Sequence, residues 1–572
     1  MKMSQKKCHR GLGRPAGFVF FFPAASAVLT VLIAVLAACS PAPKKESSNP
    51  QDIAYGRFTD FRSTVPEFKE LYKLIRATLS HNRVTFQGKT GPVSGFAAGT
   101  AYPQIWLRDS NTTIAASRYF YESAFLRSWL IEHLALQKDD GGLEDWIYSN
   151  GRFDKNTTAS DQEINAVQAA ARITEILGPG WLDDKINGQT ILSRLEKSML
   201  FVLANRFDAK LGLIKGAHTA DWGDVDMTHH DQSAIYVDAE THWTCGIYDQ
   251  GVFVSAAKSL ARMLATRGLE EQARRWEEKA QLIRINSDQW LWQEDKGFYK
   301  VHVHLDALHH DFDEDSMFAM GGNAEAIISG LASEEKCRRI IESALARQDS
   351  FKMSTISGTL LPPYPKKFFR HPMVDDPYEY QNGGQWDWFG GRFVYGMFEH
   401  GFSRQAREKL LEIAKKDIAN RGLYEWDSPA GIGQGSSFFS GSAGSLAKAL
   451  FEGYLGLKIS IDSLALEPKL GRDSATVHAY IRASDLFIAY EYVFDGTDNS
   501  LVLRYNSNIP GRGKIRILLP PAEAGQVAPW KIQGLRVRRD GATIPFASSI
   551  LGEDRFIIIE TDFKNHTLEI GR

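Results

Sequence analysis

The chain has 572 residues, of which 43% are hydrophobic and 11% aromatic, so it is long enough for more than one domain and a large core. Five of its 67 Lys and Arg residues lie in residues 1–38, which contain no Asp or Glu, and the other 62 stand against 69 acidic residues, a net charge of −7. That balance excludes the basic surface that nucleic-acid-binding proteins need, so we expect no nucleic-acid partner.

The N-terminus has the pattern of a secretory signal: basic residues, then the apolar run FVFFFPAASAVLTVLIAVLAA, then the polar stretch SPAPKKESSNPQ. Cys39 directly follows Leu-Ala-Ala, which resembles the lipobox of bacterial lipoproteins. This resemblance implies a signal peptide over residues 1–38, a lipid on Cys39, a flexible tether over 39–52 and anchoring at the outer membrane or the periplasmic face of a bacterial envelope. About 20 apolar residues are also enough to span a bilayer, so an uncleaved membrane anchor is the alternative.

Amphipathic helices follow the tether. Apolar residues recur three and four positions apart in stretches 65–79, 111–136, 162–177, 191–207, 251–268, 269–292, 332–348, 391–401, 403–422 and 440–457. Long segments rich in Gly, Asp, Trp and Tyr separate alternate helices, and loops of that length inside a compact domain are usually functional. About a dozen helices connected in this way predict a mainly α fold, a closed (α/α)6 toroid over residues 53–458 with its long loops at one end.

The pattern changes after residue 458. Apolar and polar residues alternate between turn signals in stretches 475–494, 500–508, 514–520, 530–544, 555–563 and 566–572. These stretches predict an antiparallel β-sandwich over residues 459–572. Two cysteines remain beyond Cys39, Cys245 and Cys337, and the sequence does not show whether they pair.

Several loop segments place aromatic side chains among carboxylates and amides. Proteins bind carbohydrate in this way, because sugar rings have apolar faces and polar edges. The candidate substrate-binding residues are Trp106, Arg108 and Asp109 in IWLRDS, Glu144 and Asp145 in LEDW, Trp222 in ADWGD, and Tyr380, Gln381, Asn382, Trp386 and Trp388 in YQNGGQWDW. For Arg108 and Asp109 the alternative is an ion pair that orients the loop.

The segment Gly216–Tyr236, GAHTADWGDVDMTHHDQSAIY, concentrates four aspartates and three histidines around Trp222. A metal site is one interpretation, because His229, His230 and Asp231 recur as the triplet 309–311. Adjacent histidines project poorly toward a single ion, and no H-E-x-x-H or spaced Cys/His set accompanies them. The acidic stretch DFDED (311–315) suggests calcium but lacks EF-hand spacing. We therefore expect a wall of a substrate cleft, with no metal and no cofactor.

The motifs WLRDS, DWGD, QNGGQWDWFGGRFVYGMFEHG, YEWDSPAGIGQGSSFFSGSAGS and EGYLGLK occur in an order that resembles the six-hairpin (α/α)6 glycosidases. The likeness covers roughly residues 53–460. It is greatest to glycoside hydrolase family 63, and the chain also resembles family 94 phosphorylases and bacterial debranching α-glucosidases. The chain departs from the family 63 pattern at Trp426, Ser428 and Ala430, and it reads FFSGSAG where the family has F-x-W-[ST]-A.

This resemblance implies an exo-acting, inverting glycoside hydrolase that acts on α-linked glucosides or similar short oligosaccharides. It implies Asp224 as the general acid, with Asp221 as the second candidate, and Glu425 as the general base. Two other functions remain open. A glycoside phosphorylase needs a basic phosphate pocket, for which Lys366, Lys367, Arg370 and His371 are the candidates. A non-catalytic, glycan-binding surface lipoprotein needs only the aromatic residues.

Overall fold

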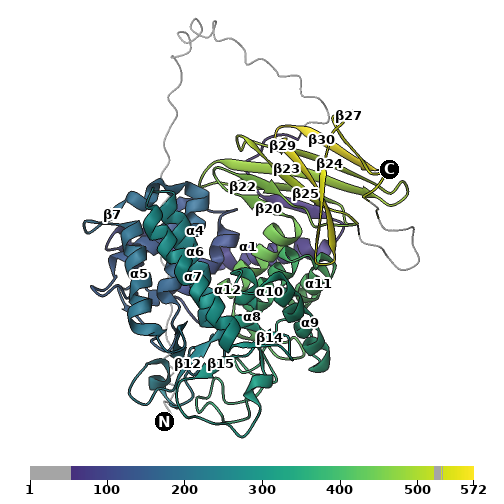
Figure 1. Cartoon of the computed structure of the whole chain (residues 1–572). Coiled ribbons are helices and arrows are strands. Elements are labelled where there is room, and N and C mark those ends of the chain that lie inside the picture. Colours follow the sequence, from purple (N-terminus) through teal and green to yellow (C-terminus); the bar gives the residue numbers. More distant parts are fainter. Residues whose placement is uncertain (1–52, 521–529, 531, 572) are drawn as a thin grey trace, which may run out of the picture. The chain divides into compact units, whose positions relative to one another are not determined.

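The computed structural model describes residues 53–520, 530 and 532–571, and twelve α-helices lie within them (Figure 1). The predicted signal peptide, Cys39 and the tether lie outside the described residues. One compact unit begins at Ile53.

The helices form two concentric layers. The inner helices are α2 (Leu107–Ser117), α4 (Gln162–Leu177), α6 (Ile247–Ala265), α8 (Met320–Ile328), α10 (Asp387–Glu399) and α12 (Ser440–Ala447). Each contacts the next and α12 contacts α2, so the ring closes. The outer helices, each in contact with the ring, are α1 (Pro66–His81), α3 (Ser123–Ala135), α5 (Ile191–Arg206), α7 (Glu270–Trp290), α9 (Glu334–Ser350) and α11 (Ser403–Asn420). The predicted (α/α)6 toroid is therefore confirmed.

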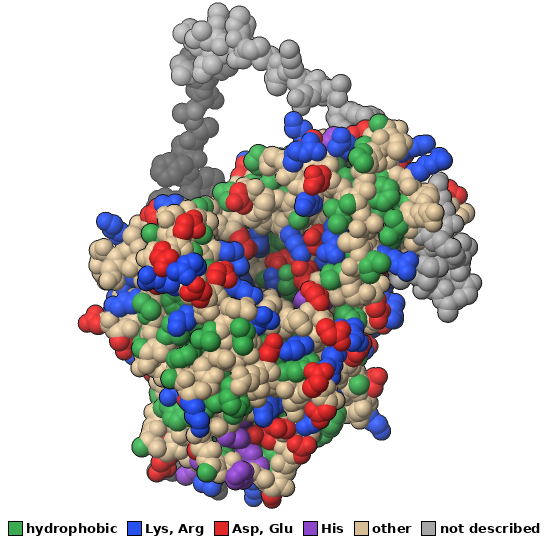
Figure 2. All heavy atoms as spheres, in the orientation of Figure 1, with side chains coloured by type: hydrophobic (Ala, Val, Ile, Leu, Met, Phe, Trp, Pro, Cys, Tyr) green, Lys and Arg blue, Asp and Glu red, His purple; other side chains and the backbone are tan. Residues whose placement is uncertain are grey.

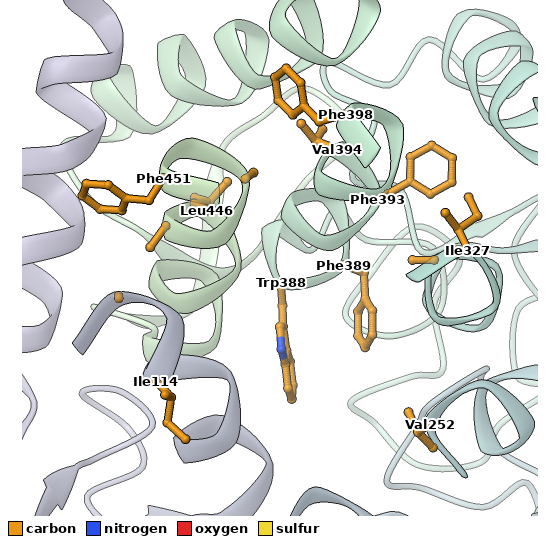
Figure 3. Packing of buried hydrophobic residues seen from close by; sticks show 14 of the residues in the cluster. Ile114, Val252, Ile327, Trp388, Phe389, Phe393, Val394, Phe398, Leu446 and Phe451 are labelled. Carbon is orange, nitrogen blue, oxygen red and sulfur yellow. The ribbon is translucent and has the colours of Figure 1, made fainter. Parts of the chain in front are cut away.

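The core of the toroid lies between the inner helices. Figure 3 shows Trp388, Phe389 and Phe393 of α10 among apolar side chains from α2, α6, α8 and α12. Small residues let these helices approach closely: a Cβ atom at Gly444 of α12 would lie 2.4 Å from the backbone oxygen of Thr112 in α2. Because such a contact is far inside van der Waals distance, the closure of the ring between α12 and α2 depends on this glycine.

The helical region differs from the sequence prediction in three places. The stretch 111–136 is two helices, α2 and α3, because the chain turns after Ser117 from the inner to the outer layer. Helix α8 was not predicted, since its nine residues MGGNAEAII contain two glycines and little periodicity. A hairpin of β2 (Arg83–Gly88) and β3 (Gly91–Phe96) follows α1, in a region for which only helices were predicted.

Short strands organise the loops between the helices. They are β4 (Ile105–Trp106), β5 (Trp146–Ile147), β6 (Phe153–Asp154), β7 (Lys185–Ile186), β8 (Gln189–Thr190), β9 (Phe207–Asp208), β10 (Leu213–Ile214), β11 (Gly216–Ala217), β12 (Trp243–Gly246), β13 (Trp292–Gln293), β14 (Phe298–Tyr299), β15 (His302–His304), β16 (Phe318–Ala319), β17 (Leu360–Leu361), β18 (Tyr424–Asp427) and β19 (Gly433–Ser437).

The C-terminal region forms two sheets. The seven-stranded sheet has the order β1 (Asp60–Ser63), β22 (Ala475–Ile481), β23 (Leu486–Asp495), β24 (Ser500–Ser507), β30 (His566–Gly571), β26 (Arg536–Arg539) and β27 (Ala542–Thr543). The five-stranded sheet has the order β20 (Leu457–Ile459), β21 (Leu464–Leu466), β25 (Arg512–Leu518), β29 (Asp554–Asp562) and β28 (Ala547–Leu551). A strand-rich C-terminal region is thus present where the alternating pattern predicted it.

Two details of the sheets correct the sequence prediction. The sheets are not wholly antiparallel, because β21 and β25 run parallel. The chain passes through β22, β23 and β24 of the other sheet between them, and this crossover returns it in the same direction. In addition, β1 pairs with β22, so residues 60–63 join the C-terminal sheet although they precede the first helix.

The two cysteines for which the sequence left pairing open, Cys245 and Cys337, are both free and buried. Within residues 53–520, 530 and 532–571, no helix has both the length and the apolar character needed to cross a membrane.

Candidate active site

A cavity of about 210 Å³ opens among the loops that precede the inner helices. The first residues of α2, α4 and α10 reach it, together with residues just before α10 and α12. Ten of the predicted site residues line it: Trp106, Arg108, Asp109, Asp145, Trp222, Asp224, Tyr380, Trp386, Trp388 and Glu425. Residues that lie more than 300 positions apart in the sequence therefore meet in one pocket, because the toroid brings the starts of its inner helices together.

Glu425 lies on β18, is only 3% exposed and lines the cavity. One carboxylate oxygen accepts a hydrogen bond from the Tyr102 hydroxyl at 2.9 Å, and the other accepts one from the Ser436 backbone N–H at 2.9 Å. The turn that delivers this N–H requires a glycine, since Gly435 has φ +67° and a Cβ there would lie 2.5 Å from Glu425 Oε2. Burial raises the pKa of Glu425, and the hydrogen bonds from Ser436 and Tyr102 oppose that rise.

A buried charge cluster fixes the strand that carries Glu425. Lys416 of α11 contacts the carboxylates of Asp387, Asp417 and Asp427, and all four residues are buried. Asp427 belongs to β18 and Asp387 begins α10, so this Lys416 centre ties the strand to two helices. The ammonium group and the three carboxylates neutralise one another in part, as buried charges must.

Asp224 stands in the long loop between β11 and β12, with 31% of its side chain exposed. Its Oδ1 accepts from Arg108 at 3.0 Å, and its Oδ2 accepts from Gln381 Nε2 at 3.2 Å. Arg108 also binds both oxygens of Asp161, at 2.8 and 3.0 Å. Arg108 therefore acts as a bridge between the start of α4 and the Asp224 loop, and the ion pair with Asp109 that was the alternative from the sequence does not form.

Four predicted site residues do not line the cavity. Asp221 turns away from it and accepts hydrogen bonds from the Gly322 N–H at the start of α8. Glu144 pairs with Lys138 at 3.1 Å. Asn382 is fully buried and bonds backbone groups of the loop before it, while Gln381 reaches the site only through Asp224. Sequence spacing cannot show these directions, because side chains in irregular loops have no fixed period.

Three residues that line the cavity carry a buried polar atom without a hydrogen bond. These atoms are Asp109 Oδ1, Trp106 Nε1 and Trp222 Nε1, and none bonds to the described residues. Buried polar groups in proteins are nearly always satisfied, so these atoms are suited to the hydroxyl groups of a ligand. Burial raises the pKa of Asp109 to about 7 and that of Asp145 to about 8, in keeping with a cavity that excludes water.

Aromatic side chains form the apolar part of the wall. The Trp222 ring lies edge-on to Trp386, with ring centroids 4.7 Å apart, and Tyr380 packs on Trp386 at 5.1 Å. Trp106 and Trp146 stand 6.2 Å apart on the side of α2. This combination of aromatic faces and open polar atoms matches the two kinds of surface that a sugar ring presents.

Sequence reasoning missed further lining residues: Ala98, Tyr102, Trp146, Asp154, Lys155, Asn156, Gln162, Val225, Ile235, Tyr236, Met373 and Phe439. Tyr102 is the most informative of them, because it donates to Glu425. Its position four residues before Trp106, in the same loop, is the one signal in the sequence that points to it.

The basic residues predicted for a phosphate pocket do not assemble. Only His371 lines the cavity; Lys366 pairs with Asp376, and neither Lys367 nor Arg370 reaches the lining. The predicted metal alternative does not assemble as proposed either, because His229 pairs with Asp226 and Asp238. In the DFDED stretch, Asp313 and Asp315 face Lys296 and Lys300.

Solved structures share the fold. No protein-family model and no curated protein matches the chain. The GH78 family rhamnosidase of Bacillus sp. GL1 is 14% identical, with a TM-score of 0.57 over 82% of this chain and 43% of that chain. The α-L-rhamnosidase from Dictyoglumus thermophilum is 13% identical, with a TM-score of 0.59 over 91% of this chain and 51% of that chain. This chain therefore spans about half the length of these two enzymes or less.

The GH63 mannosylglycerate hydrolase from Thermus thermophilus is 15% identical over 66% of this chain and 99% of that chain, with a TM-score of 0.48. The likeness to the two rhamnosidases is one of fold. The resemblance to family 63 in particular stays a prediction.

Proposed function

We propose that the chain is a glycoside hydrolase that removes single sugars from α-linked glucosides or similar short oligosaccharides. The observation that carries this proposal is the cavity in which Asp224 and Glu425 stand together among tryptophans and unpaired polar atoms. Its volume of about 210 Å³ is below the roughly 300–1,000 Å³ of sites for drug-sized ligands, which favours one sugar ring at a time. The two rhamnosidases that share the fold support the same class of reaction.

The proposed mechanism uses one carboxyl group on each face of the glycosidic bond. Asp224 gives its proton to the leaving oxygen as the bond to the anomeric carbon breaks. Glu425 takes a proton from the water that attacks the same carbon from the opposite face. The product sugar has the inverted configuration, and the two residues exchange protons with solvent before the next turn of the cycle.

The contacts of Glu425 support its part in this scheme. Two donors, the Tyr102 hydroxyl and the Ser436 N–H, face its oxygens and favour an ionised carboxylate, which a general base must be. Asp109, whose Oδ1 has no partner among the described residues, is placed to bind a sugar hydroxyl beside the reacting centre. Asp221 takes no direct part, because it is bonded to the start of α8.

The decisive experiment incubates the purified chain with a panel of aryl α- and β-glycosides and disaccharides, including α-glucosides and α-L-rhamnosides. We expect release of single sugars from an α-glycoside, with the inverted anomer as the first product in proton NMR. Release of the retained anomer would overturn the inverting scheme. Turnover that strictly needs inorganic phosphate would favour a phosphorylase, and tight binding without turnover would favour a glycan-binding protein.

We also propose that the chain is a lipoprotein of the bacterial cell envelope, anchored through Cys39. The support is the order of basic, apolar and small residues before this cysteine. Metabolic labelling with a radioactive fatty acid should mark the wild-type chain and not Cys39→Ala. A wild-type chain that stays in the membrane without label would identify the apolar run as an uncleaved anchor instead.

Finally, we infer that the two C-terminal sheets form the predicted β-sandwich. The Tyr505 hydroxyl of β24 lies 2.9 Å from Thr561 Oγ1 of β29, and its ring packs on Phe563. These contacts join one sheet to the other, as the inner faces of a sandwich do.

A further inference from the structure

Four histidines and one glutamate gather beside the loop that carries Asp224. His218 follows β11, and His302 and His304 belong to β15. His310 lies in the loop after β15, and Glu314 begins the short 3-10 helix that follows this loop. We call these five residues the His218 cluster. Figure 2 shows that histidine side chains also gather at the surface in the lower part of the view, where Figure 1 labels β12 and β15.

The geometry of the cluster is compact. The ring centroid of His218 lies 4.4 Å from that of His302, 5.0 Å from that of His304 and 5.6 Å from that of His310. His302 and His304 point to the same face of β15 because they are two residues apart on one strand. Their Nε2 atoms lie 3.1 and 2.7 Å from the Glu314 carboxylate, while Nε2 of His218 lies 3.4 Å from it.

The cluster has more nitrogen atoms than hydrogen-bond partners for them. His218 is fully buried; its Nδ1 has no hydrogen-bond partner among the described residues, and its Nε2 faces Glu314 Oε1 at 3.4 Å without a hydrogen bond. His304 Nδ1 is likewise buried without a hydrogen bond among the described residues, and His310 Nε2, also without one, faces Glu314 Oε1 at 3.4 Å. A buried ring nitrogen that makes no hydrogen bond loses the one it would make to water, and a single glutamate cannot serve four imidazoles, so a group that accepts nitrogen lone pairs is expected here.

We propose that His218, His302, His304 and Glu314 bind one divalent transition-metal ion of the Zn²⁺ type, with His310 at the edge of the site. The potential ligand atoms of His218, His302 and His304 lie within 4.8 Å of one another. Two ligands on one tetrahedral zinc stand about 3.4 Å apart, given Zn–N bonds of about 2.0–2.1 Å. Small movements of the side chains therefore bring the donors into coordination.

The donor set selects the kind of metal. Imidazole nitrogens suit zinc, copper, nickel and iron, whereas Ca²⁺ and Mg²⁺ prefer oxygen ligands. Metal ions bind the neutral imidazole through a ring-nitrogen lone pair, and His218 is fully buried beside two further imidazoles. Tyr364 donates to Glu314 Oε1 at 2.8 Å, an outer hydrogen bond of the kind that orients metal-binding carboxylates.

Four protein ligands leave no open position, so the ion has a structural role. It joins β15 to the loop that runs from His218 to Asp224. Tyr364, which donates to Glu314, also connects the cluster to Asp224. Its backbone N–H donates to Asn382 Oδ1, and the neighbouring Gln381 donates to the Asp224 carboxylate. On the proposed function, the metal fixes the position of the general acid and takes no part in the chemistry.

The test uses the purified full chain with an affinity tag that contains no histidine. After dialysis against a chelator and then against buffer, Zn²⁺ is titrated in by calorimetry, and Co²⁺ is added separately as an optical reporter. We expect one equivalent of Zn²⁺, the intense visible bands of tetrahedral Co²⁺, and a rise in Tm of about 2–4 °C at saturating zinc. His302→Ala and Glu314→Gln should lose all three signals.

His309→Ala is the matched control, because His309 is exposed and adjacent to His310 but outside the cluster. It should bind Zn²⁺ as the wild type does. The Co²⁺ spectrum needs no variant, so a variant that fails to fold does not weaken the test. Absence of stoichiometric Zn²⁺ in the wild type, or Zn²⁺ binding that survives His302→Ala, would overturn the proposal. Because these readouts need no substrate, they are independent of whether the chain hydrolyses glycosides.

Discussion

Behind Glu425 stands one lysine among three aspartates, whereas beside the loop of Asp224 stands one glutamate among four histidines. In the Lys416 centre, the chain supplies its own cation to a group of acids. In the His218 cluster, the chain supplies nitrogen donors in excess and only one acid. The first group is complete as it stands, and the second is complete only with a cation from outside.

This difference has a consequence for the two sides of the cavity. The Glu425 side of the cavity is held by charged side chains of the protein itself, so its geometry does not depend on a metal ion from solution. The Asp224 side depends, on our proposal, on the supply of a metal, and it also stands in a longer and more exposed loop. The three experiments below test the two sides separately, from the largest expected effect to the smallest.

Removing either cavity carboxylate should have the largest effect. Glu425→Gln and Asp224→Asn keep the shape of each side chain, and each should lower turnover by about 10²–10⁴ while Tm stays close to that of the wild type. The two sides should differ with the substrate. An aryl glycoside with a very good leaving group needs no proton, so Asp224→Asn should recover much of its activity on it and Glu425→Gln should not.

Steady-state kinetics on two aryl glycosides that differ only in the acidity of the leaving phenol measure this difference. If both variants lose the same factor on both substrates, Asp224 is not the acid. Activity of Asp224→Asn equal to that of the wild type would exclude it from the mechanism altogether.

Removing the cation of the Lys416 centre should have the next largest effect. Lys416→Met leaves Asp387, Asp417 and Asp427 without their common partner, and it should lower the free energy of unfolding by about 3–5 kcal/mol. Lys415→Met is the control, because Lys415 is its exposed neighbour in α11 and should change the free energy of unfolding by about 0.5 kcal/mol or less.

Urea unfolding followed by tryptophan fluorescence measures both variants. A chelator should not change the difference between them, since the Lys416 ammonium group itself contacts the three carboxylates. If Lys416→Met is as stable as Lys415→Met, the aspartates are not held by this lysine.

The contrast also explains what the sequence predicts well and what it does not. The ring of helices follows from apolar residues three and four apart, and α4 begins and ends where that pattern does. Carboxylates among tryptophans pointed to ten of the residues that line the cavity. Helix α8 was not predicted, because it has only nine residues, two of them glycines, and they give no clear apolar pattern.

The His218 cluster could not be predicted for a different reason. Its members come from positions 218 and 302–314, and only the pairing of β11, β12 and β15 brings them together. The sequence suggested the adjacent pairs His229–His230 and His309–His310 instead. Of these four residues, only His310 belongs to the cluster. In the same way, Asp221 and Asp224 look equivalent in DWGD, although the backbone sends one side chain to α8 and the other to the cavity.

Asp221 provides the smallest and most specific of the predicted effects. Asp221 has a φ of 56° and binds the Gly322 N–H, and desolvation raises its pKa to about 8 from an ordinary value of 3.8. A carboxyl group whose pKa is raised by folding stabilises the protein fully below its unfolded pKa, and that contribution is lost as pH rises through the folded pKa. The wild-type Tm should therefore fall between about pH 4 and pH 8 in part because of Asp221. Asp221→Asn keeps an oxygen for the Gly322 N–H and removes the ionisation, so its Tm should depend less on pH and exceed that of the wild type above pH 8.

The turnover of Asp221→Asn should stay within about tenfold of the wild type, in contrast to the loss of about 10²–10⁴ in Asp224→Asn. Calorimetric scans from pH 4 to pH 9, together with the same glycoside assay, compare the two variants. An Asp221→Asn variant that keeps the wild-type slope of Tm against pH would show that Asp221 is ionised in the folded protein. An Asp221→Asn variant as inactive as Asp224→Asn would identify Asp221, and not Asp224, as the proton donor. The part of the loop that the metal has to position would then be the part that carries Asp221.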